Sequence, residues 1–132
     1  MKHIAICQQP FFDMILCGKK TIESRWSTRK IPPYNRVQKG DMILLKETGK
    51  DVTAQATARE VMYYDLTPEI ADEIRLKYGK EIGIDFFSDW QEKRQKRYCT
   101  LIWLENIKKI NPIKVRRGNR SGWISENSER TS

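Results

Sequence analysis

The chain of 132 residues carries 25 lysine or arginine side chains against 17 aspartate or glutamate side chains, a net charge of +8 at neutral pH. This length fits a single domain whose core needs no disulfide staples. The three cysteines form no CxxC pair and His3 is the only histidine. Few residues could therefore form a zinc site or a Ser-His or Cys-His catalytic pair, and we expect neither metal nor cofactor.

The first elements are a strand, a turn and a short helix. Residues 3–7 are apolar and rich in isoleucine, which predicts a strand. Gln8 and Gln9 then lead into an amphipathic helix, because Pro10 sets a helical φ and apolar residues recur after it. Gly18 follows the last apolar position, where a left-handed residue commonly ends a helix.

From Ile22 onward the hydrophobic period changes to two, which predicts a strand with one mainly apolar face and one charged face. Glu23 and Arg25 share the charged face. Two interpretations of this pair remain open. They are either solvated neighbours, whose ion pair contributes about 0 to 1 kcal/mol, or part of a functional edge. Trp26, on the apolar face, is either core or a surface for stacking.

The middle of the chain alternates turns with strands. Two prolines make residues 27–38 a loop, and the turn at residues 39–41 opens an apolar strand over 42–45. Residues 52–58 alternate small apolar with polar side chains, which predicts a half-buried strand that bends or bulges before Val61.

Two helices and a strong strand are expected next. Thr67 and Pro68 begin a helix that Gly79 ends, and a second helix starts at Asp85, buries Phe86, Phe87 and Trp90, and runs into residues 93–97. Residues 98–104 form the strongest strand, which should be central. The strand breaks at Asn111 and Pro112, and residues 126–132 form a flexible polar tail.

Positive charge is concentrated late in the chain. Residues 93–120 hold ten basic side chains and one acidic one, so this span carries +9 and the remainder is close to neutral. A polyanionic partner explains the asymmetry, as does a basic, solubilising surface. For a nucleic-acid partner, the expected backbone contacts are Lys93, Arg94, Lys96, Arg97, Lys114, Arg116 and Arg117. With no apolar run long enough to span a membrane, we expect a cytoplasmic protein without a membrane partner.

The pattern GxKxxExR, filled by Gly18, Lys20, Glu23 and Arg25, resembles the signature of the ASCH domain family. The Gln-Gln-Pro turn into a helix, the turn at 39–41, the strand at 98–104 and a closing Ser-Gly-Trp resemble the same family, in the same order. The resemblance implies an α+β fold, a PUA-like small β-barrel flanked by three or so helices, as one domain over residues 1–125.

The resemblance also implies a function, because ASCH proteins are regarded mainly as RNA-binding modules. We therefore expect RNA, a nucleotide or a modified nucleoside as partner, held in a cleft between the first helix and the motif strand. Lys20 and Arg25 suit a phosphate or a base carbonyl, and Trp26, Tyr34 and Trp123 are candidates for base stacking. The expected ligand-binding residues are Gln8, Gln9, Gly18, Lys20, Glu23, Arg25, Trp26, Arg120 and Trp123.

A hydrolase is the alternative, since one bacterial branch resembling this chain more loosely hydrolyses acetylated cytidine and other members are reported as ribonucleases. Lys20 and Glu23 would then be catalytic. The enzymatic branch has threonine where Glu23 stands and pairs its lysine with a later glutamate, whose counterpart among Glu69, Glu73, Glu81 and Glu92 the sequence does not identify. A protein-interaction domain that uses the basic surface is a third, weaker possibility.

Overall fold

The computed structural model describes residues 1–115 and 122–126, and within these ranges six strands form one mixed sheet in the order β2-β5-β4-β3-β1-β6. Strands β1 and β3 run parallel, and the other neighbours run antiparallel. The strands are β1 Lys2–Cys7, β2 Ile22–Ser27, β3 Met42–Glu47, β4 Val52–Asp65, β5 Tyr98–Ile113 and β6 Trp123–Glu126. The helices are α1 Phe11–Leu16, α2 Pro68–Ile82 and α3 Trp90–Lys93, with a 3-10 turn, η1, at Ile84–Phe86.

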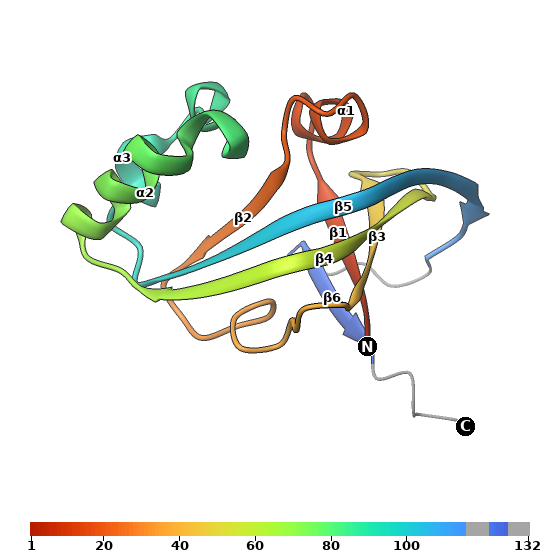
Figure 1. The fold of residues 1–132 in the computed structure, drawn as a ribbon, viewed down its shortest axis with the longest axis horizontal. Coiled ribbons are helices and arrows are strands. Elements are labelled where there is room, and N and C mark those ends of the chain that lie inside the picture. The colour runs from red at the N-terminus through yellow and green to blue at the C-terminus, as the bar shows by residue number, and fades with distance from the viewer. Residues whose placement is uncertain (116–121, 127–132) are drawn as a thin grey trace.

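The sheet curls into a half-barrel, and α2 and α3 lie together at one end of the long strands β4 and β5, as Figure 1 shows. This confirms the expected α+β fold with a small barrel-like sheet and three helices. The curvature has a local cause, because the pairing of β4 with β5 shifts register at three places. One shift falls between Ala58 and Glu60, close to the predicted bend, and such bulges increase the twist of a strand.

Apolar side chains fill two main clusters on the sheet. One lies under α1 and centres on Ile15, Leu45 and Ile102, while the other lies under α2 and includes Ile74 and Leu101. Cysteines 7 and 99 are buried free thiols. Among the described residues, no group of His, Cys, Asp and Glu side chains could hold a metal ion, and no helix is long and apolar enough to cross a membrane.

The only imidazole is part of the core. His3 is fully buried, and its Nε2 lies 2.8 Å from Asp41 Oδ2 while its Nδ1 lies 2.9 Å from Ser125 Oγ. Because the carboxylate can only accept, Nε2 carries the proton and Nδ1 accepts from the hydroxyl. Burial lowers the pKa of His3, although Asp41 opposes that shift. The cluster joins β1 to β6 and to the turn before β3.

The end of α2 differs from the prediction. Thr67 caps the helix as expected, with its side chain accepting from the Ile70 amide, but the helix continues through Gly79 and ends at Gly83. Gly83 has φ +81°, whereas Gly79 has no positive φ. The two glycines lie four residues apart, so both fit the end of the same apolar stripe, and Ile82 at 0 % exposure shows that the core contact extends one turn further.

This difference gives a matched pair of substitutions. A Cβ at Gly83 would adopt a left-handed conformation and lie 3.1 Å from Met14 Cε, whereas one at Gly79 would meet only ordinary contacts of 3.5 Å or more. We expect Gly83→Ala to lower the free energy of unfolding by about 1 to 2 kcal/mol. Gly79→Ala should raise it by about 0.5 to 1 kcal/mol. Urea unfolding of both variants checks this, and equal midpoints would contradict it.

Two further elements also differ from the prediction. The helix expected from Asp85 is instead the turn η1 followed by α3, which starts only at Trp90, and Phe86 is 60 % exposed rather than buried. Strand β5 runs through Asn111 and Pro112 to Ile113. The proline is tolerated because β2 covers only residues 98–103 of β5, and because a register shift falls where Val52 pairs with Ile113.

Candidate functional site

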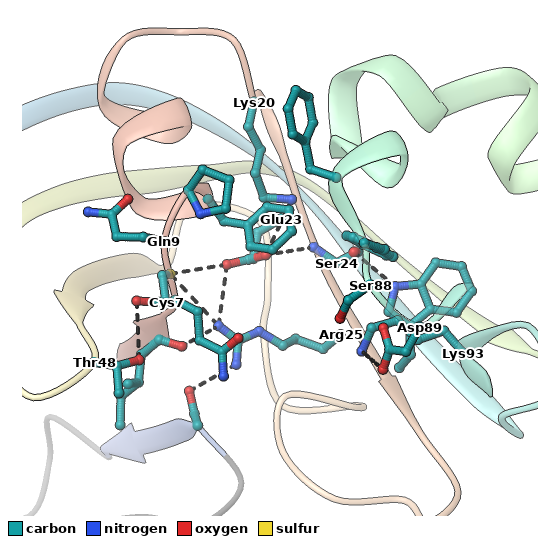
Figure 2. A pocket seen from close by; sticks show the side chains of 18 residues that line it. Cys7, Gln9, Lys20, Glu23, Ser24, Arg25, Thr48, Ser88, Asp89 and Lys93 are labelled. Atoms are coloured by element: carbon teal, nitrogen blue, oxygen red, sulfur yellow. Dashed lines mark hydrogen bonds and ion pairs between the residues drawn. The ribbon is translucent and has the colours of Figure 1, made fainter. Parts of the chain in front are cut away.

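The three charged side chains of the GxKxxExR pattern meet at one point. Glu23 lies between the other two, with its Oε1 3.6 Å from Lys20 Nζ and its Oε2 3.3 Å from Arg25 Nη2. Figure 2 shows this arrangement at the floor of a cavity. Glu23 and Arg25 share a face of β2, as alternation requires, and Lys20 reaches them because the turn after α1 folds over the start of that strand. The ion pair of Glu23 and Arg25 is therefore part of a buried cluster and not a solvated pair on the surface.

Lys20 connects β2 to the end of α2. The residue is 1 % exposed, and its ammonium donates to the Ile22 carbonyl at 2.9 Å and to the carbonyl of Ile82, the last residue of α2. With Glu23 close by, all three N–H donors of the ammonium face acceptors. Burial lowers the pKa of Lys20, and the charge of Glu23 opposes this shift.

Arg25 joins the motif strand to both ends of the chain. Its Nη1 donates to the Gly122 carbonyl and its Nη2 to the Ile6 carbonyl, each at 3.0 Å. The guanidinium carbon lies 5.3 Å from the centre of the Trp123 ring. Burial alone would lower the pKa of Arg25, but Glu23 outweighs it and raises the pKa. Among residues 1–115 and 122–126, nothing accepts from its Nε–H, which leaves that donor for a ligand.

Glu23 is held ionised by its surroundings. Burial alone would raise its pKa, but Arg25 and Lys20, with hydrogen bonds from the Cys7 thiol at 3.3 Å and the Ser24 amide at 2.9 Å, lower it to about 2. Burial and the neighbouring carboxylate raise the pKa of Cys7. Cys7 is therefore a neutral thiol that donates to Glu23, and not a nucleophile.

A cavity of about 620 Å³ opens over this cluster, within the size range of small-molecule sites. Its walls come from the end of β1 and the following turn, from β2, and from residues 86–89 with Lys93. In Figure 2, Gln9 and Thr48 lie on one side of the cavity, and Asp89 and Lys93 lie on the other. Of the expected ligand-binding residues, those that line the cavity are Gln8, Gln9, Lys20, Glu23, Arg25 and Trp26.

Two of the expected ligand-binding residues do not line the cavity. Gly18, with φ +83°, forms the turn after α1 and does not line the cavity. Trp123 is 1 % exposed, so its ring supports Arg25 from the core instead of offering a face for stacking. Arg120 lies outside the described residues. Tyr34, a stacking candidate, packs on Tyr63 and Tyr98.

Several residues that line the cavity were not predicted from the sequence. Phe87, Ser88 and Asp89 line the wall opposite β1, and Asp89 is the N-cap residue of α3. The sequence analysis placed these residues inside one continuous helix from Asp85. The Ser-Asp pair before Trp90 is, however, a recognisable signal for the start of a helix. Trp26 is half-buried, its Nε1 donates to Ser24 Oγ at 2.9 Å, and it reaches the cavity while also packing against the α2 cluster.

The basic segment is partly neutralised by local ion pairs. Arg94 makes a two-point pair with Asp72, with distances of 3.0 and 2.7 Å, and Lys96 lies 3.7 Å from Glu92. Lys93 lies 3.8 Å from Asp89 and lines the cavity. Arg97 and Lys114 are exposed and have no carboxylate partner among the described residues. Arg116 and Arg117 lie outside those residues, so their contact with a nucleic-acid backbone stays a prediction.

Comparison with known proteins bears on the family and the fold. The family model for the ASCH domain matches residues 6–117. The crystal structure of ASCH from Zymomonas mobilis superposes with a TM-score of 0.71 at 20% identity and covers 97% of this chain and 89% of that one. A mutant of the same protein gives 0.65 at 23% identity, covering 86% and 76%. No curated protein matches this chain.

Proposed function

Because the chain belongs to the ASCH domain family, whose members are regarded mainly as RNA-binding modules, we propose that it binds RNA or a nucleotide in the cavity over Glu23. One observation carries the proposal. The cavity combines cationic groups, Arg25 and Lys93, with aromatic walls from Phe11, Trp26 and Phe87. Cations suit a phosphate, and aromatic rings suit the face of a base.

The electrostatics of the cavity favour an anion. Lys20, Arg25 and Lys93 bring three positive charges, against two negative charges from Glu23 and Asp89. The low pKa of Glu23 keeps that carboxylate charged, and the ion pairs fix the guanidinium in place before any ligand arrives. A donor group held in position in this way loses little conformational entropy on binding. The exposed side chains of Arg97 and Lys114 would add contacts to the backbone of a longer RNA.

A hydrolase has one observation in its favour, which is that burial lowers the pKa of Lys20 and so increases the share of neutral amine. The rest of the site gives this alternative less support. All four later glutamates considered from the sequence are exposed and none lines the cavity. The carboxylate that does line it besides Glu23 is Asp89, and two backbone carbonyls hold the Lys20 ammonium.

The test uses a fluorescein-labelled RNA of ten nucleotides for anisotropy, and the four ribonucleoside 5′-monophosphates for calorimetry. We expect the logarithm of the RNA association constant to fall linearly with the logarithm of the salt concentration, by about 0.7 per phosphate contacted. We expect Lys93→Ala to weaken binding of the best monophosphate by roughly tenfold, the effect of removing one charge-assisted contact.

The matched control is Lys96→Ala. Lys96 is 28 % exposed against 29 % for Lys93, and each pairs with a carboxylate on the preceding turn, but Lys96 does not line the cavity. Its replacement should change the affinity for the best monophosphate by less than twofold. Affinity that does not depend on salt, or equal losses in the two variants, would contradict the proposal.

A further inference from the structure

A second, smaller cavity of about 190 Å³ adjoins the first. The two share part of their lining, namely Ser24, Arg25, Trp26 and Lys93. The remaining lining of the second cavity comes from the loop after β2, at Ser27 and residues 31–33, and from Thr100 on β5. Neither the loop nor Thr100 belongs to the site derived above.

The walls of the second cavity are largely preformed. Residues 31–36 are fixed by backbone hydrogen bonds, from the Ile31 amide to the Arg29 carbonyl and from the Tyr34 amide to the Ile31 carbonyl, both at 2.9 Å. The Tyr34 ring packs against Tyr63 and Tyr98 on β4 and β5. Ile31 is nonetheless 39 % exposed at the rim, which places apolar surface where a ligand can cover it.

Thr100 gives the second cavity a polar floor. The residue is 1 % exposed and lines the cavity, and its hydroxyl makes no hydrogen bond to any residue within 1–115 or 122–126. Because no fully buried side-chain oxygen or nitrogen of the described residues lacks a partner, this hydroxyl must remain accessible, and Thr100 lines the cavity. An apolar rim, an indole and an unpaired hydroxyl together suit a flat ring with polar edges.

The size and the shared wall indicate what this ring is attached to. A cavity of about 190 Å³ is smaller than the usual site for a complete ligand, so it suits one unit of a larger molecule. The cations common to the two cavities, Arg25 and Lys93, stand where a group joining two such units would lie. In a nucleic acid strand, that joining group is a phosphate diester.

Building on the proposed function, we propose that the second cavity is a subsite for the neighbouring nucleotide, so that the ligand is an RNA strand of at least two nucleotides. One nucleotide occupies the main cavity, the phosphate diester lies against Arg25 and Lys93, and the next base lies between Trp26 and the loop at Ile31. Thr100 binds the edge of that base.

The test compares the four ribonucleoside 5′-monophosphates with the corresponding 5′-phosphorylated homodinucleotides by calorimetry on the full chain. We expect at least one dinucleotide to bind roughly tenfold more tightly than its monophosphate, an advantage consistent with one additional stacked base. Ile31→Asp should reduce this advantage to less than threefold, because the carboxylate repels the strand and removes the apolar rim. Thr100→Val, checked for folding by circular dichroism, should reduce it as well.

Ile113→Asp is the matched control, since Ile113 is also an exposed isoleucine, at 45 %, and lies at the far end of β5. It should retain the full advantage. Dinucleotides that bind no better than monophosphates would overturn the subsite and leave the proposed function standing. An advantage that survives both Ile31→Asp and Thr100→Val would overturn the subsite too. Failure of every nucleotide and of the RNA to bind would overturn both proposals.

Discussion

Glu23→Gln is expected to lower the free energy of unfolding by about 3 to 5 kcal/mol at pH 7, because it leaves the buried charges of Lys20 and Arg25 without their carboxylate. The glutamine keeps the size of the side chain, so the loss reports charge and not packing. Urea unfolding monitored by circular dichroism measures it. Glu105→Gln, an exposed glutamate on β5, is the control and should shift stability by less than about 0.5 kcal/mol.

The same variant should change the response to acid. The pKa of Glu23 is about 2 in the folded protein, against an ordinary value of 4.5. A carboxylate with a lowered pKa contributes stability that is fully present above pH 4.5 and is lost as the pH falls towards 2. The difference in unfolding free energy between wild type and Glu23→Gln should therefore shrink over that interval. A difference that stays constant between pH 7 and pH 3 would show that Glu23 is not held ionised by its neighbours.

Lys20→Met should be nearly as damaging. Methionine fills most of the same volume, but the Ile22 and Ile82 carbonyls lose the Lys20 donor, and Glu23 loses one of its two cationic neighbours and keeps Arg25. We expect a loss of about 2 to 4 kcal/mol in unfolding free energy. Binding of monophosphates should weaken as well, because Glu23 loses its contact with Lys20, and Glu23 in turn positions Arg25.

Lys19→Met is the control for Lys20→Met. Lys19 precedes it directly in the chain and is exposed, so its replacement should alter stability by less than about 0.5 kcal/mol. Equal stability of the two variants would contradict the anchoring role of Lys20. The same two variants distinguish binding from hydrolysis. We expect no turnover when the protein is incubated with acetylated cytidine or, separately, with RNA. Turnover that Lys20→Met abolishes and Lys19→Met retains would instead support a hydrolase.

Local signals carried much of the fold prediction. The change of period at Ile22 placed β2, and Thr67 with Pro68 placed the start of α2, because each depends on a few neighbouring residues. The errors arose where tertiary contacts decide. Gly79 and Gly83 both follow apolar residues and so both fit the end of a helix. Only the packing of Ile82 in the core shows that the helix continues to Gly83. Pro112 reads as a break in sequence but lies where β5 pairs on one side only.

The site shows the same division. Alternation indicated that Glu23 and Arg25 share a face, but no local signal could show that the ammonium of Lys20 reaches across to α2, 62 residues further along the chain. Trp123 looked available for stacking because it follows a basic, glycine-containing stretch. Its burial depends on the pairing of β6 with β1, which joins residues about 120 positions apart. Contacts at such separations are beyond any pattern read along the sequence.

The hydrogen bonds from Arg25 to two backbone carbonyls determine when the cavity can form during synthesis of the chain. Its partners, Ile6 and Gly122, come from opposite ends of the described chain, and Gly122 lies 97 residues after Arg25. A ribosome-bound chain that has not yet emerged as far as Gly122 cannot place the guanidinium correctly. The wall of the cavity at Arg25 is therefore completed only after the chain has emerged as far as Gly122, and fragments that end before this residue should bind nucleotides more weakly than the chain of 132 residues.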